Sequence, residues 1–156
     1  MICFNVAGTR FNLRAAAIIE HQGKVLLHRA ASDDFWTLPG GRVEPGEDAA
    51  ATVAREMREE LDESVDCGHL VMLIENFFAV AGQANHELGL YFQARLAEDS
   101  TLPRRASPFL VTDNGVPFEF NWFSRGQLAA LHVLPLPVKE LLLDDDRRLR
   151  HVVDRG

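Results

Sequence analysis

The sequence is poor in basic residues relative to acidic ones, and it has no long apolar run. Sixteen lysines and arginines stand against 23 aspartates and glutamates, so the formal net charge is −7 at pH 7. A nucleic-acid polymer requires a basic face on its partner, and this balance argues against broad binding to DNA or RNA. No stretch approaches the ~18 consecutive apolar residues of a membrane-spanning helix, so we expect no membrane partner.

Cysteine is also scarce. The two cysteines, Cys3 and Cys67, lack the spacing of a metal site, and we expect them to be reduced thiols. The start, Met-Ile-Cys-Phe, lacks the basic and apolar segments of a signal peptide, so we expect a cytoplasmic protein. Histidines are scattered without metal-ligand spacing and are interpreted as surface or satisfied side chains: His21, His28, His69, His86, His132 and His151.

The chain of 156 residues, 47% of them hydrophobic, is long enough for one domain with its own core, which we expect to span residues 1–156. Apolar periodicity and turn residues predict a mixed α/β domain. The expected elements are two strands within 14–29 with a turn at 21–23, a helix over about 47–61, strands over 69–81 and 86–96 with a turn at 82–85, an irregular stretch over 97–117, a strand over 118–124, and short helices over about 125–132 and 138–143.

The helix expected over 47–61 carries carboxylates crowded into its last two turns. Glu56 and Glu60 are four residues apart and share one side, and Glu59 lies beside them. Like charges at this end of a helix are unfavourable. They are either a solvated helix surface or the oxygen ligands of Mg²⁺ or Mn²⁺, and the second interpretation gains support from Gly40 and Gly41, whose backbone can approach the helix closely.

The segment over residues 41–63 resembles the Nudix box, whose pattern is G-x5-E-x7-R-E-U-x-E-E-x-G-U with U a bulky apolar residue. The matching positions are Gly41, Glu47, Arg55, Glu56, Met57, Glu59 and Glu60. The final glycine of the pattern is Asp62 here, and the final apolar residue is Glu63. Aspartate reaches the left-handed conformation more readily than most residues, so we expect the helix to end at this point.

The resemblance implies an α/β/α sandwich with a mixed sheet, in which the helix over about 47–61 is catalytic. It also implies hydrolysis of the diphosphate in a nucleoside diphosphate linked to another group. In that family the box residues hold Mg²⁺ or Mn²⁺, here Glu56, Glu59 and Glu60 with the Gly40 carbonyl. Glu56, Glu59 and Arg55 would then take part in catalysis, while Gly41 and the ion pair of Glu47 with Arg55 would be structural.

Residues outside the box are weaker candidates. Glu87 and Glu119 are candidate general bases because each lies at an expected strand end, although an exposed carboxylate is the simpler interpretation of either. Arg14 and Arg29 lie on strands near the box and are candidate phosphate ligands, or else surface and ion-pair residues. Aromatic residues that could stack on a nucleobase are Trp36, Phe77 and Phe78, and for the two phenylalanines we expect a core position instead.

Two further functions compete with hydrolysis of a small nucleotide such as ADP-ribose, an NTP or dNTP, or a dinucleoside polyphosphate. One is a catalytically inactive module that senses a nucleotide, and the retained box carboxylates argue against it. The other is a structural Ca²⁺ site, which the absence of an EF-hand pattern disfavours. We expect specificity to lie in the loops over 82–85 and 97–117. The sequence leaves open whether the chain forms a homodimer.

Overall fold

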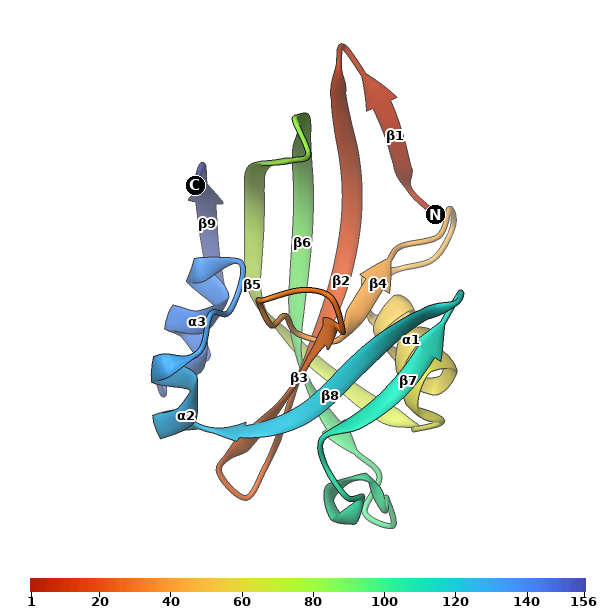
Figure 1. Cartoon of the computed structure of the whole chain (residues 1–156), viewed down its shortest axis with the longest axis vertical. Coiled ribbons are helices and arrows are strands. Elements are labelled where there is room, and N and C mark those ends of the chain that lie inside the picture. The colour runs from red at the N-terminus through yellow and green to blue at the C-terminus, as the bar shows by residue number, and fades with distance from the viewer.

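A computed structural model describes residues 1–156 of the chain (Figure 1). The elements, in chain order, are β1 (Cys3–Val6), β2 (Thr9–His21), β3 (Lys24–Ala30), β4 (Gly40–Arg42), α1 (Ala49–Leu61), β5 (Val65–Val80), β6 (Gln83–Leu96), the 3₁₀ turn η1 (Leu102–Arg104), β7 (Phe109–Asp113), β8 (Val116–Ser124), α2 (Arg125–Ala130), α3 (Leu136–Leu142) and β9 (Arg150–Asp154). No helix is both long and apolar enough to cross a membrane.

The strands form a mixed sheet in the order β7-β8-β3-β2-β6-β5-β9, with β1 and β4 also paired to β2. The β2–β6 and β5–β9 pairs are parallel and the others are antiparallel. β2 and β3 pair only beside their turn, at Glu20 with Val25 and at His21 with Lys24. The β3–β8–β7 strands therefore diverge from the rest of the sheet, as Figure 1 shows.

Helices cover both faces of this sheet, which confirms the predicted α/β/α sandwich. Successive side chains of β2 point to opposite faces, as in any strand. Ala15, Ala17 and Ile19 pack in one core cluster with the apolar face of α1. Ala16 and Ile18 pack in the other cluster with residues of α2 and α3. Helix α1 thus packs on one face of the long strand β2. The short strand β4 pairs with β2 and also contacts α1.

Helix α1 begins two residues later than predicted, at 49 instead of about 47, and ends at 61 as predicted. The helix begins at Ala49, and the Asp48 side chain accepts a hydrogen bond from the Ala51 amide (2.8 Å) as its N-cap. Glu47 therefore lies before the helix rather than in its first turn. Its carboxylate accepts hydrogen bonds from Thr52 and Arg55 of the helix. Asp62 takes the left-handed conformation (φ 54°) at the C-terminus, as predicted.

Other predicted elements need correction. The β5–β6 turn is at Ala81 and Gly82, both with positive φ, and not over 82–85. Asn85 is buried in β6, where its amide donates to the Gln83 carbonyl (2.8 Å). The stretch over 97–117, expected to be irregular, contains η1 and β7, and the strands β1, β4 and β9 were not predicted. Each of these strands has five or fewer residues, too few for an alternating pattern.

Candidate active site

A bracing ion pair fixes the loop before α1 to the helix. Arg55 donates from Nε and Nη2 to the two carboxylate oxygens of Glu47 (2.8 and 2.9 Å). The Thr52 hydroxyl donates to the same carboxylate (2.6 Å), and Arg55 also reaches the Arg42 carbonyl (3.1 Å). The hydrogen bonds from Arg55, the largest cause, lower the pKa of Glu47 to about 2. The structural role expected of this pair agrees with the geometry.

Replacing Glu47 by Gln is expected to destabilise the fold by about 2–3 kcal/mol at neutral pH, because it breaks a charge-assisted fork on a side chain only 17% exposed. The folded pKa is depressed below its usual 4.5, so this stability is present above that pH and is lost as the pH falls toward about 2. Urea unfolding at pH 7 and at pH 3 measures the difference. Glu98→Gln, at an exposed position, is the control, and equal losses in both variants would contradict the role.

Gly40 and Gly41 bring bare backbone against β2 and α1. A Cβ on Gly40 would lie 2.2 Å from the Ala15 carbonyl oxygen, within the backbone of β2. A Cβ on Gly41 would lie 2.2 Å from Oε1 of Glu56 and 2.3 Å from its Cδ. The Glu56 carboxylate therefore rests on the Gly41 backbone, in the space where any other residue would have its side chain. This contact explains why the pattern needs glycine at residue 41.

Glu56 and Glu60 form a half-buried pair of carboxylates on α1. Glu56 is 14% exposed and accepts a hydrogen bond from Arg55 (2.9 Å), whereas Oε2 of Glu60 is buried without any partner. Burial, followed by the neighbouring Glu56 charge, raises the pKa of Glu60 to about 8. Burial likewise raises the pKa of Glu56, against the opposing effect of Arg55. Asp113, at the end of β7, adds negative charge to both.

Glu59, the third predicted metal ligand, lies apart from this pair. Its side chain is 58% exposed and pairs with Arg55 (3.3 Å). No group of three or more His, Cys, Asp or Glu side chains is gathered closely enough to hold a metal ion. The structure therefore brings Glu56 and Glu60 together beside Gly41 and turns Glu59 toward the arginine.

The donor set fits a hard divalent cation. Two partly desolvated carboxylates lie beside the backbone of β4, and one of them has an oxygen without a hydrogen-bond partner. Carboxylate and carbonyl oxygens are the ligands that Mg²⁺ and Mn²⁺ accept. A cation at this point would offset the repulsion between the two charges. Glu56 and Glu60 would hold it, and Glu59 would join them by leaving Arg55.

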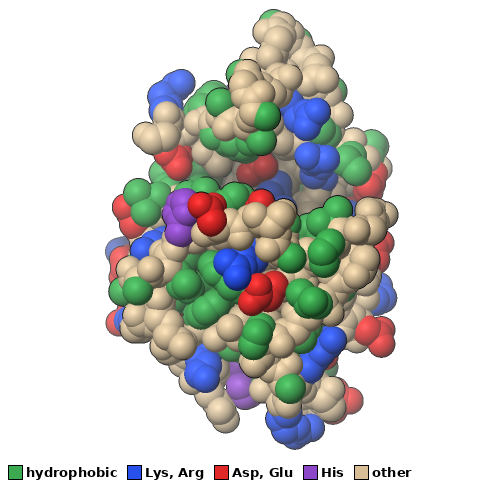
Figure 2. Space-filling model, in the orientation of Figure 1, with side chains coloured by type: hydrophobic (Ala, Val, Ile, Leu, Met, Phe, Trp, Pro, Cys, Tyr) green, Lys and Arg blue, Asp and Glu red, His purple; other side chains and the backbone are tan.

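A cleft of about 950 Å³ opens over this pair. Glu56, Glu60 and Gly40 line one part of it, with Arg14 and Glu87 on the sheet nearby. Aromatic and apolar side chains line the rest: Phe35, Phe77, Phe78, Val80, Phe118 and Leu134. Figure 2 shows acidic and basic side chains at a recess below the strands that project at the top of the molecule. The cleft thus joins a charged end to an aromatic end.

Arg14 and Glu87 both line the cleft, and their roles as phosphate ligand and general base stay predictions. Arg14 donates from Nη2 to the Leu38 carbonyl (2.8 Å), which fixes its guanidinium beside the carboxylate pair. Its charge opposes the rise in the pKa of Glu60. Glu87, on β6, lines the same cleft as Tyr91. Burial raises the pKa of the Tyr91 hydroxyl, and the Glu87 charge raises it further.

Arg29, Trp36 and Glu119 lie outside the cleft, contrary to the roles considered for them. Arg29 donates from Nε and Nη2 to Glu119 (3.1 and 3.0 Å), so both charges are already paired. Its guanidinium also lies over the Trp36 ring, 4.5 Å from the centroid. Trp36 is 5% exposed and meets Phe123 edge to face in the core. For Arg29 the structure matches the alternative interpretation of an ion-pair residue, whereas the core position of Trp36 and the pairing of Glu119 were not predicted.

Phe77 and Phe78 show the opposite outcome. We expected core positions, but both line the cleft, and Arg155 from the segment after β9 lies over the Phe77 ring at 4.3 Å from its centroid. They lie near the C-terminal end of β5, before the turn to β6, where the strand extends beyond the core. An apolar run in the sequence does not indicate which part of a strand extends in this way. His28 was also misjudged. It is buried, it lines the cleft, and its Nδ1 has no hydrogen-bond partner.

Burial, followed by the charge of Arg14, lowers the pKa of His28 to about 3. The unfolded chain binds this proton near the usual 6.5, so stability is full above that pH and is lost as the pH falls toward 3. We expect His28 alone to remove about 2 kcal/mol of unfolding free energy between about pH 8 and about pH 5. Denaturation at both pH values should show a smaller loss in His28→Gln than in the parent, with the exposed His132→Gln as control. An unchanged loss in His28→Gln would contradict the burial argument.

A family model of the NUDIX domain matches residues 10–144, and the chain therefore belongs to this family. The resemblance drawn from the box is thus confirmed. The CTP pyrophosphohydrolase of Escherichia coli (strain K12) is 45% identical over 60 residues, which are 36% of this chain and 44% of that protein. The chain thus matches less than half the length of this relative.

Solved structures show the same fold. A NUDIX hydrolase from Nitrosomonas europaea is 25% identical with a TM-score of 0.62, over 88% of this chain and 91% of that one. A MutT protein from Bacillus halodurans is 20% identical with a TM-score of 0.65, over 90% of this chain and 86% of that one. An ADP-ribose pyrophosphatase from Streptococcus suis is 19% identical with a TM-score of 0.61, over 92% and 98% of the two chains.

Proposed function

We propose that this chain is a divalent-metal-dependent pyrophosphohydrolase that cleaves the diphosphate of a small nucleotide. Membership of the NUDIX family, together with relatives named as pyrophosphohydrolases and pyrophosphatases, indicates this class of enzyme. The observation that carries the proposal is the half-buried pair of Glu56 and Glu60 at the charged end of the cleft, with the Glu56 carboxylate against the Gly41 backbone. Partial desolvation of two like charges costs free energy that an ordinary solvated helix surface avoids.

The two ends of the cleft suit different parts of a nucleotide. A diphosphate fits the charged end, where Arg14 offers a fixed cation beside the carboxylates. A nucleoside fits the aromatic end, where Phe35, Phe78 and Phe118 offer apolar surface. His28 stacks on Phe118 (5.3 Å between centroids) and remains neutral at physiological pH, so it presents an uncharged polar edge to the ligand.

Residues of the chain would share the chemistry. Glu56 and Glu60 would hold Mg²⁺ or Mn²⁺, with Glu59 and the Gly40 carbonyl as further oxygen donors. The ion, when bound, supplies charge neutralisation of the diphosphate and acidification of the attacking water. Glu87 lies in the cleft with its carboxylate available to accept a proton from that water. Arg55 keeps Glu56 in place through its fixed contact with Glu47.

The test is a panel of nucleotides with and without Mg²⁺, followed by ³¹P NMR of the products. The panel contains CTP and ADP-ribose, which are named in the relatives reported above, and a UDP-sugar, because a UDP-X diphosphatase also has this fold. We expect metal-dependent cleavage within the diphosphate of at least one compound. Binding of a nucleotide without cleavage of any member, in the presence of bound metal, would instead identify a sensor module.

A further inference from the structure

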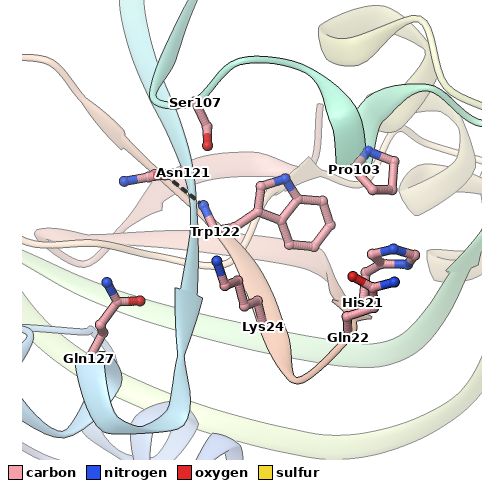
Figure 3. Close-up of a pocket in the computed structure, with 8 residues that line it drawn as sticks. All are labelled: His21, Gln22, Lys24, Pro103, Ser107, Asn121, Trp122 and Gln127. Carbon is pink, nitrogen blue, oxygen red and sulfur yellow. Dashed lines mark hydrogen bonds between the residues drawn. The ribbon is translucent and has the colours of Figure 1, made fainter.

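A second hollow lies away from the cleft, between the β2–β3 turn, β8 and the segment that includes η1 (Figure 3). Its volume is about 330 Å³. None of its lining residues is an aspartate or glutamate, whereas the catalytic cleft is lined by six acidic residues: Glu44, Glu56, Glu60, Glu87, Asp113 and Asp154. In a chain of net charge −7, a hollow without acidic side chains is suited to an anionic ligand, whereas the acidic cleft is suited to a cation.

The most informative group in this hollow is the indole of Trp122. The residue is 8% exposed, and its Nε1 is buried without an acceptor. Buried N–H groups nearly always have a partner, because an unpaired donor keeps the full cost of leaving water. Figure 3 shows the indole nitrogen on the ring edge turned toward the gap between Ser107 and Pro103.

Two side-chain amides of the lining use their oxygen atoms in hydrogen bonds within the protein. Oδ1 of Asn121 accepts from the Trp122 amide (2.9 Å), and Oε1 of Gln127 accepts from the Ser124 amide (2.8 Å). Both amide groups thus keep only their NH₂ donors. Lys24 is exposed and has no carboxylate within ion-pair distance. The hollow therefore presents the Lys24 ammonium, an indole N–H and two amide NH₂ groups, and its remaining polar lining residues, His21, Gln22 and Ser107, carry no carboxylate.

We propose that this hollow binds the phosphate group of a small molecule, with Lys24 as the counter-charge and Trp122 Nε1 as a buried donor. A lysine ammonium binds phosphate as a point charge, and a tetrahedral anion offers acceptors toward several walls at once. The ligand is either free orthophosphate or the phosphate of a nucleotide, and the hollow is separate from the cleft that holds the carboxylate pair.

The chain contains only two tryptophans, so its indole N–H groups give two signals in a ¹H–¹⁵N correlation spectrum. Trp122→Phe assigns them and removes the donor while retaining an aromatic ring. Sodium orthophosphate, CMP and acetate are titrated separately into the metal-free protein, each against NaCl of the same ionic strength. We expect a saturable shift of the Trp122 signal with orthophosphate or CMP, and no shift of the Trp36 signal. The arm that saturates at the lower concentration identifies the source of the phosphate.

Lys24→Gln is expected to weaken binding by about tenfold or more, as loss of a charge-assisted contact does. Arg58→Gln, an exposed arginine on α1, should leave the titration unchanged. The proposal is overturned if orthophosphate and CMP shift the Trp122 signal no more than NaCl does, if acetate binds more tightly, or if Lys24→Gln binds like the parent. Because no substrate turnover or metal is involved, these outcomes are independent of the proposed enzymatic function.

Discussion

Glu60→Gln is expected to lower the rate of metal-dependent cleavage roughly 10³-fold, the scale of effect seen when one group that stabilises transition-state charge is removed. The substitution preserves the shape of the side chain but removes the negative charge that the cation requires. Steady-state kinetics with Mg²⁺ on the best compound of the panel measures the loss. Glu140→Gln on α3, at an exposed position on the opposite face of the sheet, should retain the parent rate.

The same variant should be more stable than the parent without metal. In the parent, desolvation and the Glu56 charge raise the pKa of Glu60 to about 8, so folding at neutral pH requires uptake of a proton on this carboxyl, and its Oε2 has no partner. A neutral amide requires no such proton. Mg²⁺ should raise the Tm of the parent through preferential binding to the folded state, and it should have little effect on Glu60→Gln. A variant that is less stable and still active would show that the ligands are misplaced.

Gly41→Ala is expected to disable the site through Glu56. The new Cβ would lie 2.2 Å from Oε1 of Glu56, so either the carboxylate or the β4 backbone must move. A displacement of this size costs about 10²-fold in rate when it misplaces a reacting group, and overpacking a buried contact costs about 1–3 kcal/mol in unfolding free energy. Kinetics and urea denaturation of the same preparation measure the two effects.

Gly126→Ala is the matched control for this variant. A Cβ on Gly126 meets nothing within 4 Å, and the residue lies in α2 with an ordinary backbone conformation. Alanine should therefore leave the rate unchanged and leave stability equal or slightly higher. If Gly41→Ala retained full activity, the contact between Glu56 and the β4 backbone would have no role in placing the carboxylate.

The predicted part of the fold is the part with long, regular patterns. The apolar stripe of α1, the apolar run of β2, the alternation in β8 and the capping box of Ser124 with Gln127 were all recognisable in the sequence. The short edge strands β1, β4 and β9 were not, because pairing with long neighbours defines them rather than their own residues. Strand β7 was missed for the same reason, because it has five residues, pairs with β8 and lies in a stretch that contains prolines.

The site shows a similar division. The box spacing located Glu56, Glu60 and the brace of Glu47 with Arg55, because these residues interact along one helix and the loop before it. Residues contributed by distant strands were harder to judge. Trp36 and Phe78 exchanged the roles expected for them, since burial depends on which strands project beyond the core. An unpartnered buried nitrogen such as that of His28 has no signature in sequence.

The crowding of glutamates on α1 has a physical explanation in this structure. Arg55 neutralises Glu47 and contacts both Glu56 and Glu59, so one guanidinium holds the acidic face together. Glu60 is left without such a partner. Under the proposed function, a divalent cation would offset the desolvation of these two carboxyl groups.

The most direct test of this account is the number of Mn²⁺ ions bound, measured by electron paramagnetic resonance of the free ion during titration of the parent and of Glu60→Gln. The account predicts saturable binding to the parent, displaced by Mg²⁺, and a large loss of affinity in the variant with its fold intact. Equal binding by the two proteins, or no binding by the parent, would contradict a metal held between Glu56 and Glu60.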